Sequence, residues 1–202
     1  MALFRDPHVP ALGPNVQRAH SRLSSALGRF GMGLTGWRFE GEVPDLRKMV
    51  LIVAPHTSNW DFPVGLQAKL ALRLGGTFIG KHTLFRWPFG IFMRWLGGIP
   101  VNRTAASGFV SEVGAALREA DQMTVVIAPE GTRRRLEQWK SGFYRIAHEA
   151  GVPILPVGFD YSRRVIFFAP LFHTTGDYEK DLKQLRGHYR ADMGRKPGNY
   201  SA

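Results

Sequence analysis

The chain has 202 residues, of which 44% are hydrophobic and 12% aromatic, a composition that suits one folded domain and excludes a disordered protein. It contains no cysteine, which excludes disulfides, cysteine-ligated metals and a cysteine nucleophile. The 27 lysines and arginines outnumber the 16 acidic residues, and the net charge of +11 favours polyanionic partners such as nucleic acid, anionic lipid or phosphorylated substrates.

The first residues of the chain, 1–14, contain three prolines and two charges of opposite sign. They lack the apolar stretch of a signal peptide, and no window of the chain approaches the ~18 apolar residues that span a bilayer. We therefore expect a loose arm here. We also expect a cytoplasmic protein, peripherally associated with the inner face of the cell membrane.

Residues 15–34 have the spacing of an amphipathic helix. Val16, Leu23, Leu27 and Phe30 recur at helical intervals, and arginines lie between them. Such a helix either packs on its own domain or lies on an anionic membrane surface. We favour the packed helix, and the two interpretations are compatible.

From residue 48 onward, short apolar runs alternate with helical patterns. The runs are β-branched or aromatic and are bounded by glycine, proline or polar residues, which is typical of strands. This alternation predicts an α/β fold, a single domain whose mostly parallel, mixed sheet is flanked by helices, with the core at 48–170 and a C-terminal helix and tail at 177–202. The predicted strands are 49–54, 77–80, 98–101, 124–128, 153–159 and 165–169, and the predicted helices between them are 62–75, 107–120 and 141–151.

The stretch HTSNWD directly follows the first of these strands. If the strand ends near Pro55 and a helix begins near Asp61, the turn between them can bring His56 and Asp61 together. His56 Nδ1–H would then donate to the Asp61 carboxylate and leave Nε2 free as a general base. The alternative is a polar turn residue followed by an aspartate that caps the helix.

A second polar stretch, PEGTRRR, follows another apolar strand. Gly131 lets the backbone approach a ligand closely, and Thr132 and Arg133 could together hold a phosphate. Glu130 could accept a hydrogen bond from a substrate hydroxyl or orient an arginine. The alternative is a solvated turn with a basic run after it. Arg103 ends another short strand pattern, LGGIPVNR. A single arginine there would usually be structural, and it becomes a candidate binding residue only together with the two polar stretches above.

Four blocks, in this order and spacing, resemble the glycerolipid acyltransferase family, the group that contains lysophosphatidic acid acyltransferase. HTSNWD matches the family's His-x4-Asp block, GGIPVNR resembles the second block, APEGTR matches the Glu-Gly-Thr signature, and VPILPVGF resembles the fourth, proline-containing block. The resemblance covers residues 48–160. The chain departs from the pattern at Asn102, commonly acidic in the family, and at Arg134, usually a small hydroxyl residue. These departures leave the acceptor undetermined.

The resemblance implies an acyltransferase that forms no acyl-enzyme. His56, oriented by Asp61, would take a proton from the acceptor hydroxyl, whose oxygen attacks the thioester of acyl-CoA or acyl carrier protein. The acceptor would be a lysophospholipid such as 1-acylglycerol-3-phosphate, in phospholipid biosynthesis. Neither a metal nor a cofactor is required, and no nucleic-acid partner is expected. The residues expected to hold the acceptor are Arg103, Glu130, Gly131, Thr132 and Arg133, with Lys81 and Lys140 as weaker candidates.

The aromatic segment 84–97 mixes tryptophan and phenylalanine with arginine. It is either a core helix or a membrane-facing surface, where aromatic rings insert and cations meet lipid headgroups. A membrane surface would account for the positive charge without nucleic acid.

Three other functions are alternatives: acylation of another lipid hydroxyl, for instance of an aminolipid, a basic nucleic-acid-binding protein, and a metal hydrolase. Binding to nucleic acid explains the charge but neither the histidine block nor the Glu-Gly-Thr turn. The seven histidines are dispersed and form no His-Glu-x-x-His motif. One of them, His148, is expected on an exposed helix face.

Overall fold

The computed structural model describes residues 4–101 and 106–201, and a seven-stranded sheet lies at its centre. The strand order is β1-β7-β6-β2-β5-β3-β4; β6 and β7 pair antiparallel, and the other neighbours pair parallel. The strands are β1 Arg38–Glu40, β2 Lys48–Ala54, β3 Thr77–Lys81, β4 Gly98–Val101, β5 Met123–Ile127, β6 Ile154–Asp160 and β7 Val165–Phe168.

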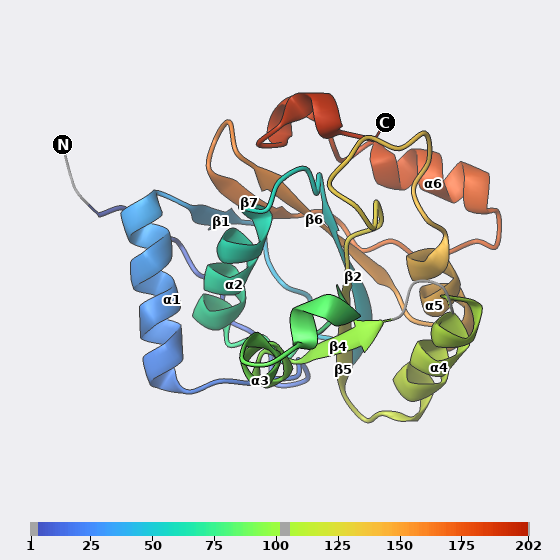
Figure 1. The fold of residues 1–202 in the computed structure, drawn as a ribbon, viewed down its shortest axis with the longest axis horizontal. Helices are drawn as coiled ribbons and strands as arrows, with labels where there is room; N and C mark the ends of the chain where they lie inside the picture. Colours follow the sequence, from blue (N-terminus) through green and yellow to red (C-terminus); the bar gives the residue numbers. More distant parts are fainter. Residues whose placement is uncertain (1–3, 102–105, 202) are drawn as a thin grey trace.

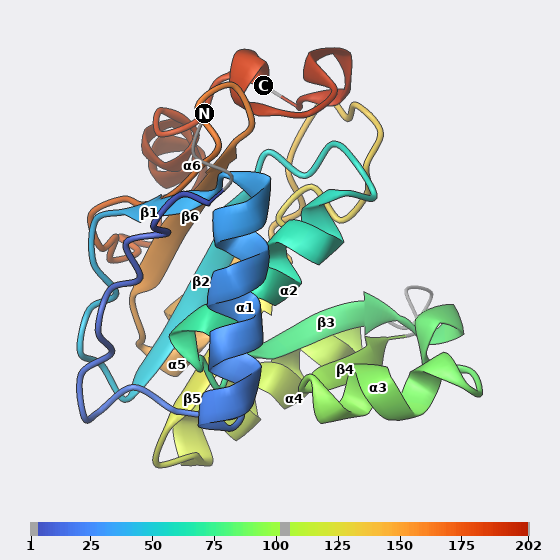
Figure 2. The same ribbon diagram turned by 90° about the vertical axis from the view of Figure 1, so that its left-hand side faces the viewer.

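Helices cover both faces of this sheet (Figure 1). Helices α1 and α2 lie on one face and α4, α5 and α6 on the other, while α3 follows the short 3-10 turn η1 beside β3 and β4 (Figure 2). The helices are α1 Arg22–Thr35, α2 Asp61–Leu72, η1 His82–Phe85, α3 Phe89–Trp95, α4 Ala106–Glu119, α5 Gly142–Ala150, α6 Tyr178–Arg186, η3 Ala191–Met193 and η4 Pro197–Asn199.

The central strand β2 shows how two hydrophobic cores form from one apolar run. Met49 and Leu51 belong to the core beneath α1 and α2, whereas Val50 and Ile52 belong to the core beneath α4, α5 and α6. Successive side chains of a strand point to opposite faces, so a continuous apolar run suits a strand that is covered on both sides.

The predicted α/β architecture is confirmed, and each of the six predicted strands lies within one residue of its expected bounds. Strand β1 is additional, because its three residues are too few to carry a periodic signal. The aromatic segment is not one buried core helix: it contains the end of η1 and all of α3, and several of its rings are exposed.

Residues 4–14 are not the loose arm that their prolines suggest. The Phe39 N–H donates to the Pro7 carbonyl (2.8 Å), which ties the arm to β1. Leu12 is buried in the core beneath α1 and α2, and Val9 packs against that core. The two apolar side chains therefore anchor a segment that has no regular secondary structure.

Helix α1 begins at Arg22 rather than at residue 15, and it packs on α2 through small residues. The Ser25 hydroxyl donates to the Ala71 carbonyl (2.9 Å), and a Cβ atom on Gly28 would lie 2.5 Å from the Ala71 nitrogen. The expectation of a packed helix is right, but the expected apolar face is wrong. The outward side of α1 carries an exposed row, here called the α1 stripe, of Leu23, Leu27, Phe30 and Leu34.

Within the described residues, no helix combines the length and the apolar character needed to cross a membrane.

We expect Gly28→Ala to lower the free energy of unfolding by about 2 kcal/mol, because the added methyl group pushes against the α2 backbone. Gly31→Ala is the matched control. It makes the same change on the same helix, but its Cβ would meet only the flexible Gln67 side chain. Helix propensity then leaves the control neutral or stabilised by up to ~1 kcal/mol. Urea denaturation measures both, and equal effects would contradict the close α1–α2 contact.

Candidate active site

Three neighbouring parallel strands deliver the polar residues of the site to one edge of the sheet. His56 follows β2 by two residues, Glu130 follows β5 by three, and Tyr161 directly follows β6. Strand β2 pairs with both β5 and β6, so the three loops are neighbours. The carboxyl ends of strands in open α/β sheets are where ligands usually bind.

His56 and Asp61 are in contact, as the sequence predicts. His56 Nδ1 lies 3.1 Å from Asp61 Oδ2, and the Ser58 N–H also donates to that oxygen (2.9 Å). Asp61 is the buried first residue of α2, whereas His56 is partly exposed. The carboxylate fixes Nδ1 as the protonated nitrogen and directs the basic Nε2 toward the open side of the site. The geometry suits a general base.

Glu130 holds the loop that carries His56 by a backbone hydrogen bond, and it lines neither of the two cavities described below. Its side chain is fully buried, and Oε2 accepts a hydrogen bond from the His56 N–H (3.0 Å). Burial is the main cause that raises the pKa of Glu130 to about 7, and the nearby Asp61 charge adds to it, while the His56 N–H opposes it. The expectation that Glu130 binds substrate is therefore corrected, because a fully buried carboxylate cannot touch an acceptor.

Two cavities of different character meet at His56. The first, of about 240 Å³, is lined mainly by apolar side chains, including Phe62, Leu66, Phe78 and Phe159. The second, of about 500 Å³, is more polar. Arg133 borders both cavities beside His56. The dyad thus sits where an apolar compartment joins a polar one.

The second cavity contains several of the predicted binding residues. Gly131, Thr132 and Arg133 line it together with Lys140. Gly131 has φ +63°, and a Cβ atom there would lie 3.1 Å from the Lys140 side chain, so glycine suits this turn. The Thr132 hydroxyl accepts a hydrogen bond from the Arg134 N–H (3.4 Å). A cationic cavity of this kind can receive a phosphate.

The remaining candidates lie elsewhere. Lys81 ends β3, and Arg103 lies outside the described residues. His148 is exposed on α5, as expected, and its Nδ1 lies 3.0 Å from the Thr174 hydroxyl. Sequence reasoning missed Tyr161, whose hydroxyl donates to Asp61 Oδ1 (2.8 Å). Its position directly after a buried strand is the signal that could have found it.

Glu130 should make stability depend on pH. Its folded-state pKa of about 7 exceeds the ordinary value of 4.5, so the neutral carboxyl stabilises the fold below pH 4.5. This contribution is lost as the pH rises through 7. Glu130→Gln keeps an acceptor for the His56 N–H but carries no charge. Relative to the wild type, we expect the variant to gain on the order of 2–3 kcal/mol between pH 5 and pH 8 in urea denaturation. Parallel pH dependences of the two proteins would refute the assignment.

Comparison with known proteins identifies the family of this chain. Residues 38–160 match a model of the acyltransferase family. The chain is 29% identical over 134 residues to the 1-acyl-sn-glycerol-3-phosphate acyltransferase of Haemophilus influenzae, covering 61% of this chain and 54% of that protein. It is 32% identical over 114 residues to the Escherichia coli protein of the same name, covering 53% of this chain and 45% of that protein. The chain thus spans about half the length of these curated relatives.

A solved structure has the same fold. The crystal structure of PlsC, the 1-acyl-sn-glycerophosphate (LPA) acyltransferase from Thermotoga maritima, superposes with a TM-score of 0.60 at 21% sequence identity. The match covers 83% of this chain and 75% of that chain. The matched region 38–160 contains His56, Asp61 and Glu130, and it extends over more than half of the sequence. The chain belongs to the acyltransferase family.

Proposed function

We propose that this protein transfers a fatty acyl group from a thioester, acyl-CoA or acyl carrier protein, to a hydroxyl of a lysophospholipid such as 1-acylglycerol-3-phosphate, in phospholipid biosynthesis. The observation that carries the proposal is the His56–Asp61 pair at the junction of an apolar and a cationic cavity. An acyl chain suits the first cavity and a phosphate the second. The names of the relatives support the same acceptor.

The geometry supports direct transfer by general-base catalysis. With Nδ1 held by Asp61, His56 Nε2 takes the proton of the acceptor hydroxyl as its oxygen attacks the thioester carbonyl. The tetrahedral intermediate collapses with loss of the thiolate, which receives the proton from His56. The acyl group passes directly to the acceptor, so the protein needs no nucleophile of its own.

The apolar cavity supports binding of the acyl chain. Phenylalanine and leucine side chains from α2, β3 and β6 surround it, and it opens beside His56. Burial of the chain's methylene groups there contributes roughly 0.8 kcal/mol for each group. The thioester carbonyl at the head of the chain would then lie near the dyad.

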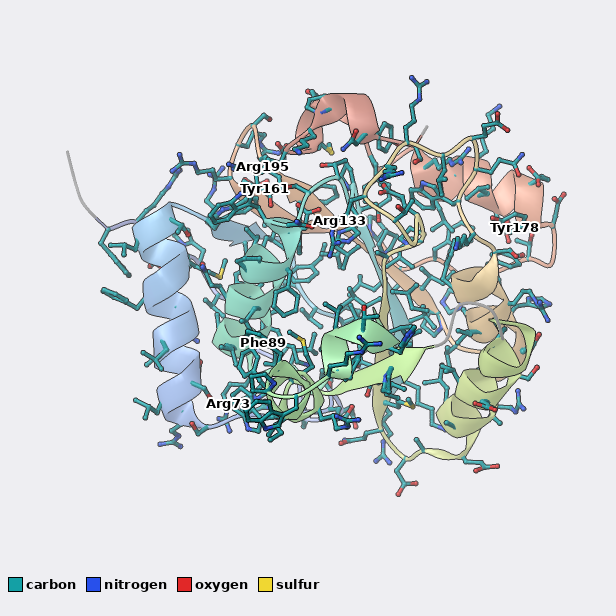
Figure 3. The ribbon with its side chains drawn as sticks, in the orientation of Figure 1. Arg73, Phe89, Arg133, Tyr161, Tyr178 and Arg195 are labelled. Carbon is teal, nitrogen blue, oxygen red and sulfur yellow. The ribbon has the colours of Figure 1, made fainter. Side chains whose placement is uncertain are left out.

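The polar cavity supports binding of the acceptor phosphate. Arg133 and Lys140 carry positive charge, and both side chains border this cavity. Arg133 also reaches the dyad region, where Figure 3 places it below Tyr161. Guanidinium and ammonium groups bind phosphate through charge-assisted hydrogen bonds. The acceptor's glycerol hydroxyl would be directed toward His56.

The α1 stripe and the aromatic segment support contact with an anionic membrane, at the inner face of the cell membrane in our proposal. Trp87 is 85% exposed, and Phe89 and Ile91 on the same segment are also exposed. The centres of the His20 ring, just before α1, and the Trp95 ring of α3 lie 4.9 Å apart, so the start of α1 lies close to α3. Arginines flank the aromatic rings. Such a surface inserts rings among lipid chains while cations meet anionic headgroups.

We expect His56→Ala to reduce acceptor-dependent acyl transfer by at least a factor of about 10², since a general base contributes 10²–10⁴-fold. Thiol release from long-chain acyl-CoA, measured with and without 1-acylglycerol-3-phosphate, gives the rate. His148→Ala, at an exposed histidine of α5, is the matched control and should keep full activity. Full activity of His56→Ala would rule out the mechanism.

We expect Trp87→Ser combined with Phe89→Ser to weaken binding to vesicles that contain phosphatidylglycerol about tenfold or more, because two exposed rings no longer insert. Vesicle sedimentation measures the binding. Vesicles of phosphatidylcholine alone are the control for the contribution of charge, and they should bind the wild type more weakly. If the variant sediments with vesicles as well as the wild type does, this segment is not part of the membrane-binding surface.

A further inference from the structure

The C-terminal segment, here residues 189–201, lies across the catalytic loop although it is outside the family match. The Lys196 N–H donates to the Thr57 hydroxyl (3.2 Å), and the Asn199 side-chain amide donates to the Thr57 carbonyl (3.2 Å). A Cβ atom on Gly194 would lie 3.0 Å from the Thr57 side chain. The segment therefore fits closely against the loop between His56 and Asp61.

The same segment fixes Tyr161, which directly follows β6. The Tyr161 N–H donates to the Met193 carbonyl (2.8 Å). The Arg195 guanidinium lies 5.8 Å from the centre of the Tyr161 ring and 5.2 Å from that of Trp60, and Figure 3 shows Arg195 beside Tyr161. The Tyr161 ring also meets the Trp37 ring edge-on, with 4.9 Å between the ring centres. Tyr161 is therefore held by its backbone and by two contacts to its ring.

The Tyr161 hydroxyl completes the hydrogen bonding of the catalytic carboxylate. It donates to Asp61 Oδ1 (2.8 Å), while Oδ2 receives the Ser58 N–H and contacts His56 Nδ1. With one oxygen bound, a carboxylate can still rotate about its Cβ–Cγ bond. With both oxygens bound, its plane is fixed, and so is the direction in which it holds the imidazole.

We propose that Tyr161 is a positioning residue for acyl transfer, which acts through Asp61 on His56 and is itself held by Arg195 and the C-terminal segment. The inference rests on the proposed function for its kinetic test. Burial is the main cause that raises the pKa of the Tyr161 phenol far above its ordinary value, and the Asp61 charge adds to it. Tyr161 therefore remains a hydrogen-bond donor throughout the physiological range.

Tyr161→Phe tests the proposal, because it removes the hydroxyl and keeps the ring against Trp37 and Arg195. The fold offers a matched control in Tyr144, whose hydroxyl donates to Asp181 Oδ2 at the same distance (2.8 Å) but far from the dyad. We expect Tyr161→Phe to lower kcat about tenfold and to leave both KM values within about twofold, since the lost hydrogen bond is one to a charged carboxylate. Tyr144→Phe should leave kcat unchanged.

Thermal unfolding separates positioning from stability. Each variant loses one tyrosine–aspartate hydrogen bond, which should lower Tm by about 2–4 °C. Tyr144→Phe also loses the hydrogen bond that the Gly176 N–H donates to the hydroxyl (3.0 Å), so its Tm should fall at least as far as that of Tyr161→Phe. Equal losses of kcat in the two variants would overturn the proposal, because the effect would then follow stability. An unchanged kcat in Tyr161→Phe would overturn it as well.

A double-mutant cycle tests the route through Asp61. Once Asp61→Asn has removed the charged carboxylate, Tyr161→Phe should cause no further decrease in kcat. Decreases that multiply would mean that Tyr161 acts on the substrate by another route and would overturn the proposal.

The chemical reactivity of His56 can be measured without any enzymatic turnover. Diethylpyrocarbonate modifies neutral imidazole, and peptide-resolved mass spectrometry can follow His56 beside His148 as an internal reference. We expect the rate of His56 modification at pH 8 to change in Tyr161→Phe, because the freed carboxylate no longer fixes the orientation of the imidazole, whereas the rate at His148 should stay the same. If the wild type transfers no acyl group but this difference appears, the proposed function fails while Tyr161 keeps its role. Equal His56 reactivity in both proteins would overturn that role.

Discussion

The site depends on one hydrogen bond between two loops, from the His56 N–H to the Glu130 carboxylate. It joins the loops that follow β2 and β5 and fixes the backbone of His56, the residue that we propose as the base. The carboxylate is fully buried, and its second oxygen has no hydrogen-bond partner among the described residues. A buried, half-satisfied carboxyl is costly for stability. The surrounding sheet and helices must supply that stability, and in return the catalytic loop has a fixed position relative to its neighbour.

Three buried or partly buried polar groups hold the partly exposed His56. Glu130 holds the backbone of His56, Asp61 holds its ring, and Tyr161 holds Asp61. These three residues come from the ends of different elements. The orientation of the imidazole therefore depends on how the three adjacent strands are paired and on where α2 begins. Small shifts in strand packing would therefore change the position of His56 Nε2. The two well-packed cores on either side of the sheet are what keep such shifts small.

The strands and the dyad could be predicted because their signals are local. An apolar run bounded by proline and glycine marks a strand, and the spacing from His56 to Asp61 fits a strand–turn–helix junction. The role of Glu130 could not be predicted, since nothing local distinguishes a carboxylate that faces substrate from one that faces a neighbouring loop. The prediction of which face of α1 packs on the domain was wrong for a related reason. Periodicity identifies an apolar face, but the close approach at Gly28 depends on α2, which lies far away in the sequence.

The outward row of leucines and phenylalanine on α1 also has a consequence for the protein away from lipid. In dilute buffer these side chains, together with the rings of the aromatic segment, face water and raise the free energy of the isolated chain. Contact between copies through these surfaces would relieve that exposure. The protein should then self-associate and precipitate when it is concentrated alone. Mild detergent, which covers the exposed apolar side chains, should keep it dispersed. The surface that we propose for membrane contact would thus also favour self-association of the purified protein.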